Sequence, residues 1–213
     1  MGQNRAPDYH WPMYLPPDFH EQDHARLLDL MRAAPFALVV SASEDGAPYA
    51  TPVPVLLEDH LEGLRLRWHL SRSNPHAAAL AGREGLVVFQ GPHALVDSAW
   101  YVSAPQVGTW NYLMVQASGP VSRLDDQQAV QFSRALTRTL TPDAPPISPE
   151  FEAKMLRGVV TFELKVARLE GKAKLSQNKG AADREAVRVH LAASEREEDR
   201  AVARLMAADM RDG

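Results

Sequence analysis

The segment from Leu64 to Ser71, LRLRWHLS, constrains the fold more than any other part of the sequence. Apolar and polar residues alternate along it, which places them on opposite faces of an extended chain. One face would hold Leu64, Leu66, Trp68 and Leu70, and the other would hold Arg65, Arg67, His69 and Ser71. This period of two predicts a β-strand with one face in a core and one polar face.

A hairpin is predicted just before this strand. Phe36 to Ser43 (FALVVSAS) has the composition of a strand, and Asp45-Gly46 after it is a strong turn signal. We expect the return strand over Tyr49 to Leu57. Pro52 and Pro54 cannot donate hydrogen bonds to a neighbouring strand, so one edge of the return strand should be unpaired or bulged.

The remaining pattern favours an antiparallel barrel with added helices over alternating β-α units. Gln90-Gly91-Pro92 is expected to form a turn between two of its strands. Further strands are predicted at 85–90, 94–101, 112–121 and 159–169. Helices are predicted at 21–33, from Asn74 (cap) and Pro75, from Asp125 or Asp126 to about Leu140, at 148–155, and from Asp183 onward with a break near Ser194.

Composition excludes several kinds of protein. The 213 residues include no cysteine, which rules out disulfides, thiolate catalysis and cysteine metal sites. With 23 basic and 27 acidic residues the net charge is −4, which argues against direct nucleic-acid binding over a broad surface. No apolar run approaches the roughly 18 residues of a membrane span, and the N-terminus does not resemble a signal peptide. We therefore expect a cytoplasmic protein without membrane contact.

Familiar catalytic motifs are missing or weak. The sequence contains no G-x-G-x-x-G, P-loop or G-x-S-x-G pattern. His20-Glu21-Gln22-Asp23-His24 matches the H-E-x-x-H zinc pattern, but its polar setting is typical of a helix start, with Asp23 as the cap or a first-turn acid. We expect no metal site.

Two polar segments could bind a ligand. His69, Ser71, Arg72 and Asn74 lie where a strand ends and a helix begins, a setting that suits an anion, although a solvated strand face with a satisfied cap would look the same. Lys172, Lys174 and Lys179 surround Ser176, Gln177 and Asn178, which suits a clamp for an anionic ligand or an ordinary polar loop. The aromatic stretch 89–119 contains Trp100, Tyr101, Trp110 and Tyr112, which could be core residues or a ligand wall.

Together these segments resemble the PaiB-like family, described as FMN-binding negative transcriptional regulators. The matching segments follow one another from about residue 10 to residue 190: Met13-Tyr14-x-Pro16-x-x-Phe19, Pro35-Phe36-Ala37, His69-x-x-Arg72-x-Asn74-Pro75, Phe89-x-Gly91-Pro92-His93-Ala94, Trp100-Tyr101, Thr109-Trp110-Asn111-Tyr112 and Leu169-Glu170-Gly171-Lys172-x-Lys174-Leu175-Ser176-Gln177-Asn178.

The resemblance implies a mainly β (α+β) fold, an FMN-binding split β-barrel with peripheral helices and a C-terminal helical tail. Such barrels form homodimers with FMN in clefts at the subunit interface. The resemblance assigns the phosphate and ribityl chain to His69, Leu70, Ser71, Arg72 and Asn74, and the ring to the strand near Thr51 and Val53. It assigns the ring side or the second subunit's wall to Trp110, Lys174, Ser176 and Gln177.

Three functions remain open at this point. The first is a flavin-dependent enzyme or redox-responsive regulator acting with a small-molecule ligand, for which no catalytic residue can be named. The second is a DNA-binding repressor without flavin chemistry. The third is a haem-handling split barrel with His69 or His93 as an axial ligand. As domains we expect an N-terminal arm (1–20), the barrel (21–182, with a helical insertion at about 125–156) and a helical tail (183–213).

Overall fold

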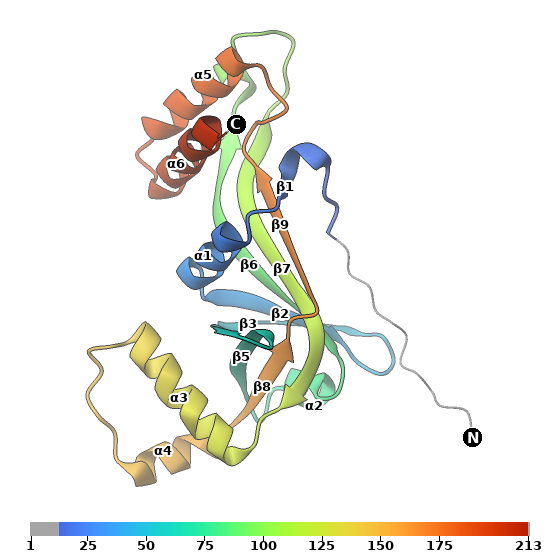
Figure 1. The fold of residues 1–213 in the computed structure, drawn as a ribbon, viewed down its shortest axis with the longest axis vertical. Coiled ribbons are helices and arrows are strands. Elements are labelled where there is room, and N and C mark those ends of the chain that lie inside the picture. Colours follow the sequence, from blue (N-terminus) through green and yellow to red (C-terminus); the bar gives the residue numbers. More distant parts are fainter. Residues whose placement is uncertain (1–12, 213) are drawn as a thin grey trace. The chain divides into compact units, whose positions relative to one another are not determined.

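The computed structural model describes residues 13–212, which fall into two compact units. The first unit contains Pro35–Val88 and Gln116–Leu169, and the second contains Tyr14–Ala34, Phe89–Val115 and the chain from Glu170 onward. Two long strands, β6 (Glu84–Val96) and β7 (Thr109–Arg123), contribute residues to both units (Figure 1). Residues 1–12 of the expected N-terminal arm lie outside the described part of the chain.

The first unit is an antiparallel sheet with three helices. Strand β2 pairs with β3 and β6, β8 pairs with β7 and β5, and β5 pairs with β4. Its other elements are β2 (Phe36–Ala42), β3 (Pro48–Pro54), β4 (Leu56–His60), β5 (Gly63–Ser71), α2 (Pro75–Leu80), α3 (Asp126–Leu140), α4 (Pro149–Leu156) and β8 (Val159–Lys165).

Strand β5 confirms the prediction made from its alternating sequence. Trp68 faces Phe162 of β8 in the pairing register, their rings stack with centroids 6.1 Å apart, and both side chains are fully buried. On the opposite face Arg67 pairs with Glu163 of β8, with Nη2 2.7 Å from Oε2. Glu163 is only 4% exposed, so this ion pair is largely buried and the charge of Arg67 is compensated within the sheet.

The predicted return strand over Tyr49 to Leu57 is wrong in one respect, because it is two strands. Pro54 ends β3, and the N–H of Val55 donates to the carbonyl of Pro35 at 2.8 Å. The chain then changes partner, so that Leu56 pairs with Arg67 of β5. The prediction of an unpaired edge is confirmed, since β3 lies at the end of the strand order with β2 as its neighbour.

The predicted strand from Val159 to Leu169 is also two strands. β8 ends at Lys165, and β9 (Arg168–Lys174) begins after a short break. At the break the N–H groups of Val166 and Ala167 donate to the carbonyls of Leu64 and Ser118, which redirects the chain. These hydrogen bonds to distant parts of the chain explain why the segment predicted as one strand forms two.

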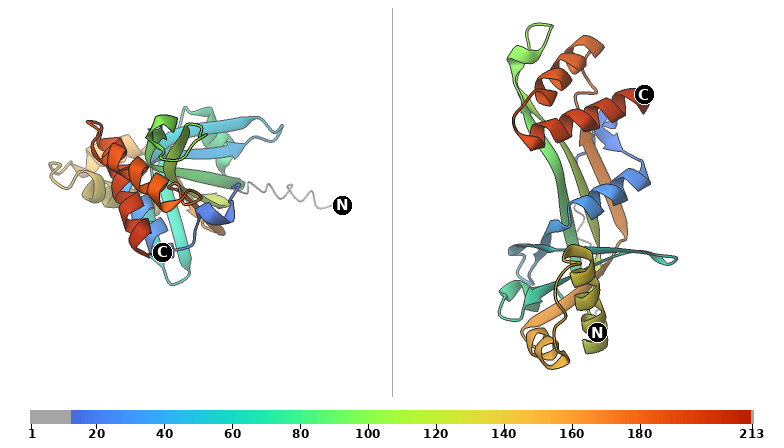
Figure 2. Two further views of the ribbon diagram at one scale, coloured as in Figure 1. Left: turned by 90° about the horizontal axis from the view of Figure 1, so that it is seen from above. Right: turned by 90° about the vertical axis from the view of Figure 1, so that its left-hand side faces the viewer.

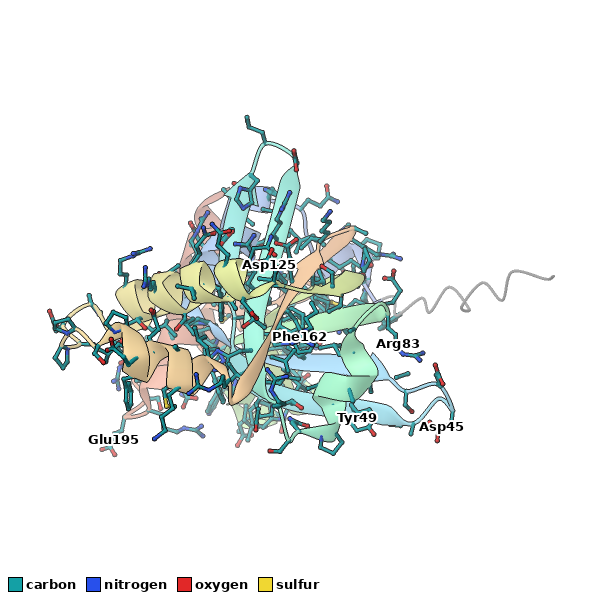
Figure 3. All side chains as sticks on the ribbon, turned by 90° about the horizontal axis from the view of Figure 1, so that it is seen from below. Asp45, Tyr49, Arg83, Asp125, Phe162 and Glu195 are labelled. Atoms are coloured by element: carbon teal, nitrogen blue, oxygen red, sulfur yellow. The ribbon has the colours of Figure 1, made fainter. Side chains whose placement is uncertain are left out.

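The hairpin and the insertion helices form where the sequence predicts them. Gly46 has a φ of +84° at the tip of the β2–β3 hairpin, and Arg83 donates to Glu44 beside this tip at 2.8 Å (Figure 3). Asp125 caps α3 in a capping box with Gln128. The two helices of the insertion are joined by Arg134 of α3, which donates to both carboxylate oxygens of Glu152 in α4.

The second unit combines strands with the three α-helices α1, α5 and α6. Strand β9 pairs with β7 and with the two-residue strand β1, and α5 and α6 lie side by side (Figure 2). Apart from β6, β7 and β9, its elements are η1 (Pro17–Phe19), β1 (His20–Glu21), α1 (His24–Ala33), η2 (Ser98–Trp100), α5 (Ala181–Ala192) and α6 (Glu197–Asp212).

The H-E-x-x-H segment is divided between two elements. The expected helix over 21–33 starts later, because Glu21 belongs to β1 and His24 is the first residue of α1. Asp23 caps the helix by accepting hydrogen bonds from the N–H groups of Ala25 and Arg26, as expected. The first histidine of the motif, His20, is therefore in a strand, and the second, His24, is at the start of a helix.

The expected turn at Gln90-Gly91-Pro92 is wrong, because β6 continues through it to Val96. Gly91 is needed for close packing, since a Cβ atom there would lie 2.6 Å from Cδ1 of Leu30 in α1. Trp100 and Tyr101 likewise lie outside the strand expected for them, at the end of η2. Among the described residues, no helix is long and apolar enough to cross a membrane.

Gly119 of β7 provides a test of the turn after β8. A Cβ atom there would lie 2.0 Å from the backbone oxygen of Lys165, which cannot move away as a flexible side chain could. We expect Gly119→Ala to lower the free energy of unfolding by about 2–3 kcal/mol in denaturant titrations. Ser118→Ala, one position earlier, adds no atom and should change it little. Equal stability of the two variants would contradict this packing.

Candidate functional site

A buried histidine connects the helix and strands around the first candidate segment. His76 of α2 is fully buried, and its Nε2 and Nδ1 lie 2.9 Å from Oγ of Ser41 and Oγ1 of Thr51. Its ring stacks on Tyr49 with centroids 5.3 Å apart. Burial lowers the pKa of His76, so the ring is neutral near pH 7. A neutral imidazole has one donor and one acceptor, so one hydroxyl donates to it and the other accepts from it.

The turn between β5 and α2 presents polar groups at the surface. Ser71 and Ser73 are exposed, and their hydroxyl oxygens lie 2.9 Å apart. Asn74 caps α2 as predicted, because its Oδ1 accepts from the N–H of His76 at 3.0 Å. His76 thus links Thr51 on β3 to Asn74 in this turn, and the structure brings these two predicted residues into one cluster.

Arg72 both supports this turn and lines a cavity. Its Nε and Nη2 donate to the carbonyls of Arg157 and Val159 at 2.9 and 3.0 Å. Both hydrogens of Nη1 and the second hydrogen of Nη2 can therefore still donate to a ligand without breaking these bonds. The cavity has a volume of about 490 Å³ and lies between α3, α4 and the ends of β7 and β8, with Arg123 and Arg157 also in its wall. Its size is in the range of small-molecule sites.

The other predicted residues of the first unit are less available to a ligand. His69 is half-buried with its ring edge toward Phe132 of α3, and burial lowers its pKa, so it is neutral near pH 7. Leu70 and Val53 are buried, at 2% and 8% exposure, and could meet a ligand mainly through their backbone.

The four remaining predicted residues belong to the second unit. Lys174 donates to Oγ1 of Thr109 and to the carbonyl of Trp110, at 2.5 and 2.6 Å. Burial, followed by the charges of Lys172 and Lys179, lowers the pKa of Lys174. Trp110 is 47% exposed and lies against the ring of His93 with centroids 5.9 Å apart.

Ser176 and Gln177 mainly hold their own loop in place. Ser176 is buried at a φ of +64°, an unusual conformation for a residue other than glycine, and exchanges hydrogen bonds with the amide of Asn111. The side chain of Gln177 accepts from the N–H of Leu175 and donates to the carbonyl of Ala173. A strained, fully bonded loop of this kind can position a neighbouring functional group.

The sequence did not predict several residues that hold the candidate site segments in place or line a pocket beside them. His76 looked like an ordinary second residue of a helix, although its position after an Asn-Pro cap could have drawn attention to it. Tyr101 was noted only as an aromatic residue, yet it is 9% exposed and its hydroxyl has no hydrogen-bond partner in the described part of the chain. Asp183 is also buried, and accepts from the N–H groups of Val102 and Ser103 at 2.7 and 2.8 Å.

Comparison with known proteins identifies the family. Residues 13–168 match the family model described as "Putative FMN-binding domain". The chain is 32% identical over 178 residues to protease synthase and sporulation protein PAI 2 of Bacillus subtilis, an alignment that covers 80% of this chain and 85% of that protein. This chain belongs to the PaiB-like FMN-binding family.

Solved structures of similar fold support the predicted architecture. The flavocytochrome Anf3 of Azotobacter vinelandii superposes with a TM-score of 0.60 at 19% identity, covering 86% of this chain and 75% of that one. The FAD and haem binding protein of Mycobacterium smegmatis gives 0.61 at 20% identity, covering 78% of each chain. The expected split β-barrel with peripheral helices and a helical C-terminal segment is confirmed.

The donor groups at the β5–α2 turn fit the phosphate of FMN, the cofactor of this family. Hydroxyl and guanidinium donors are the side-chain groups that bind phosphate oxygens most readily. Ser71 and Ser73 supply two exposed hydroxyls, and Arg72 between them supplies a cation whose position is fixed by two backbone carbonyls. The chemistry of these groups is therefore compatible with the cofactor of the PaiB-like family.

The buried His76 predicts a pH dependence of stability. Because burial lowers its pKa from 6.5, the unfolded chain takes up a proton first as the pH falls, so folding loses free energy below about pH 6.5. His76→Gln keeps a donor and an acceptor but removes the proton uptake. We expect the difference in free energy of unfolding between the wild type and His76→Gln to shrink from about pH 8 to about pH 5 in urea titrations. His69 is present in both proteins, so its own titration cancels in this difference. A constant difference would contradict a neutral, buried His76.

Proposed function

We propose that this chain binds FMN with the phosphate at the β5–α2 turn. The observation that carries the proposal is the group of exposed donors from Ser71, Arg72 and Ser73, with the two hydroxyl oxygens 2.9 Å apart. A phosphate monoester carries close to two negative charges near pH 7, so it gains both from the cation and from the hydroxyl donors. The helix cap at Asn74 fixes the turn that carries them.

The rest of the cofactor is proposed to follow the end of β5 and the edge strand β3. His69 and the backbone of Leu70 would border the ribityl chain, and the ring would lie along β3 near Thr51 and Val53. Thr51 is held by His76, so its hydroxyl is oriented before any ligand arrives. A preoriented hydroxyl loses little entropy on binding. We therefore assign Thr51 a positioning hydrogen bond to the flavin.

The ring side of the cleft, or the wall that the partner subunit supplies, would be formed by Trp110, Lys174, Ser176 and Gln177. Trp110 has an exposed aromatic surface that could cover a flavin ring. Lys174 would add positive charge, while Ser176 and Gln177 would hold the loop that carries it.

We further propose that the protein is a homodimer with the cleft at the subunit interface. An apolar sheet face supports this, because Phe36 and Leu38 on β2 are 68% and 37% exposed and lie beside Pro54 and Pro52 on β3. A contiguous apolar face of this kind is unusual on a monomer's surface and is typical of a protein interface.

FMN would supply two-electron redox chemistry, and the protein would supply binding, orientation and charge. We propose a cytoplasmic flavin-dependent protein that acts on a small molecule, as an enzyme or as a redox-responsive regulator. The name of the Bacillus relative, which refers to protease synthesis and sporulation, supports a regulatory role. Regulation would be indirect, since the arginines of the C-terminal helices have acidic partners, as Arg188 with Glu185 and Arg200 with Glu197.

Haem binding is the second candidate, because both structural neighbours described above bind haem according to their names. His93 is a possible axial ligand, being partly exposed and beside Trp110. An absorbance spectrum of the purified protein followed by titration with FMN and with haem separates the candidates. Flavin bands and saturable FMN binding support the proposal. A Soret band with no flavin binding would overturn it in favour of haem, and sequence-specific DNA retention at physiological salt without either ligand would favour a repressor.

The proposed phosphate contact can be tested at the two serines. Ser71→Ala combined with Ser73→Ala removes both hydroxyls without disturbing the carbonyl bonds of Arg72. Because hydrogen bonds to charged groups contribute about 1.5–3 kcal/mol each, we expect FMN affinity to fall at least 10-fold in a fluorescence titration. Ser122→Ala, an exposed serine on β7, is the control and should bind FMN normally. Unchanged affinity of the double variant would place the phosphate elsewhere.

The proposed dimer can be tested on the exposed apolar face. Phe36→Asp places a charge that would be buried between subunits, so we expect a monomer by light scattering and a large loss of FMN affinity. Leu61→Asp is the matched control, because Leu61 is fully exposed in the turn between β4 and β5. Tight FMN binding by a monomeric Phe36→Asp variant would refute the interface cleft.

A further inference from the structure

The second unit contains a small pocket with the chemistry of an anion site. The pocket has a volume of about 210 Å³. Its polar walls come from Tyr101, Lys174 and Lys179, and Phe19 and Val107 form apolar walls. The volume is below the roughly 300–1,000 Å³ of sites for drug-sized ligands, so it suits a small molecule.

The hydroxyl of Tyr101 is the first observation that points to a ligand. The side chain is more than nine-tenths buried, and its oxygen has no hydrogen-bond partner among residues 13–212. A buried hydroxyl without a partner costs free energy unless a ligand or water satisfies it. Burial and then the negative charge of Asp183 raise the pKa of Tyr101, so the phenol keeps its proton and is a donor at neutral pH.

The two lysines are the second observation. The acceptors described for their ammonium groups are neutral oxygens: Thr109 Oγ1 and the Trp110 carbonyl for Lys174, and Gln106 Oε1 for Lys179. Each ammonium group has three donors, so both lysines can serve a further acceptor. Burial, followed by the charges of Lys172 and Lys179, lowers the pKa of Lys174, and a bound anion would offset the repulsion between these cations.

Asp183 does not compete for these cations as a free anion would. Its Oδ1 accepts from the N–H groups of Val102 and Ser103, and its Oδ2 accepts from the hydroxyl of Ser103. Three hydrogen bonds from the loop after η2 thus hold this carboxylate, and its effect on Lys179 is through its charge. The two ammonium groups of Lys174 and Lys179 outnumber the single carboxylate of Asp183, so the sum of these three charges is positive.

The apolar walls select an organic anion over an inorganic one. The ammonium group of Lys174 lies 6.0 Å from the ring centroid of Phe19, and that of Lys179 lies 5.0 Å from the ring centroid of Tyr101. Each lysine of the pocket thus lies beside an aromatic ring. A carboxylate could meet Tyr101 and the lysines while an attached apolar group meets Phe19 and Val107.

We propose that this pocket binds a small organic carboxylate, with the Tyr101 hydroxyl and the Lys174 and Lys179 ammonium groups donating to the carboxylate oxygens. The site goes beyond cofactor binding, because two of its three donors, Tyr101 and Lys179, are not among the proposed flavin contacts; Lys174 is shared with the proposed flavin wall. It gives the protein a class of ligand, and for a flavin enzyme it would give the class of substrate.

Calorimetric titration of the full-length protein with benzoate tests the proposal. Benzamide has the same shape without the charge, and inorganic phosphate has charge without the apolar group. We expect saturable benzoate binding and at least 10-fold weaker binding of both comparison ligands. Equal binding of benzamide, tighter binding of phosphate, or no benzoate binding would overturn the proposal.

Two variants locate the binding. Tyr101→Phe removes only the unpartnered hydroxyl, so the melting temperature should not fall while benzoate affinity falls about 10-fold; Tyr112→Phe, outside the pocket, is its control. Lys179→Met should weaken benzoate binding by a similar factor, with Lys154→Met on α4 as its control. Wild-type benzoate affinity in either pocket variant would refute the site.

FMN titration of the same proteins separates this site from the cofactor site. Tyr101→Phe and Lys179→Met should keep wild-type FMN affinity, because neither residue is part of the proposed flavin contacts. If FMN does not bind the wild type but benzoate does, the cofactor proposal fails and the carboxylate site stands. If both variants lose FMN instead of benzoate, the pocket belongs to the flavin and the carboxylate proposal fails.

Discussion

The pairing of β5 with β8 is the constraint on which the first unit depends. Trp68 and Phe162 are buried on one face of this pair, and Glu163 is held between the arginines of β5 on the other, so both faces fix the same register. A shift by one residue would bury arginine in the core and expose Trp68. The register also determines where β5 ends, and therefore where Ser71 and Arg72 are presented beside α2. The candidate phosphate site is a consequence of core packing.

Residues whose environment is set locally could be read from the sequence. The alternation of β5, the Asn74 cap, the Asp125 cap and the Asp45-Gly46 turn all formed as predicted, because each depends on neighbours in the chain. Boundaries set by tertiary partners could not be read. β3 and β4 separate because Val55 bonds to Pro35, and β6 passes through Gly91 because α1 packs against it.

The residues of the candidate sites also fall into two groups, those that the sequence predicts and those that only the structure shows. Motif spacing found the β5–α2 turn and the lysine loop, whereas His76 and Tyr101 became visible only through burial and hydrogen bonding. His76 bonds to two hydroxyls from different strands, and the Tyr101 hydroxyl has no hydrogen-bond partner among the described residues. The hydrogen bonds of His76 depend on residues 25 or more positions away in the chain, and the state of Tyr101 is defined by a missing hydrogen bond. Neither condition leaves a pattern in the sequence. The donors of the β5–α2 turn are compatible with the cofactor of the FMN-binding family, and the proposed pocket around Tyr101 adds a ligand class that the family name does not contain.

The central claim is that the turn after β5 holds the phosphate of FMN. Comparing FMN with riboflavin, which lacks the phosphate, in one fluorescence titration of the wild-type protein tests it most directly. If hydroxyls and a guanidinium group contact the phosphate, FMN should bind at least about 100-fold more tightly than riboflavin, and increasing salt should weaken FMN far more. Equal affinities for the two flavins would contradict the account.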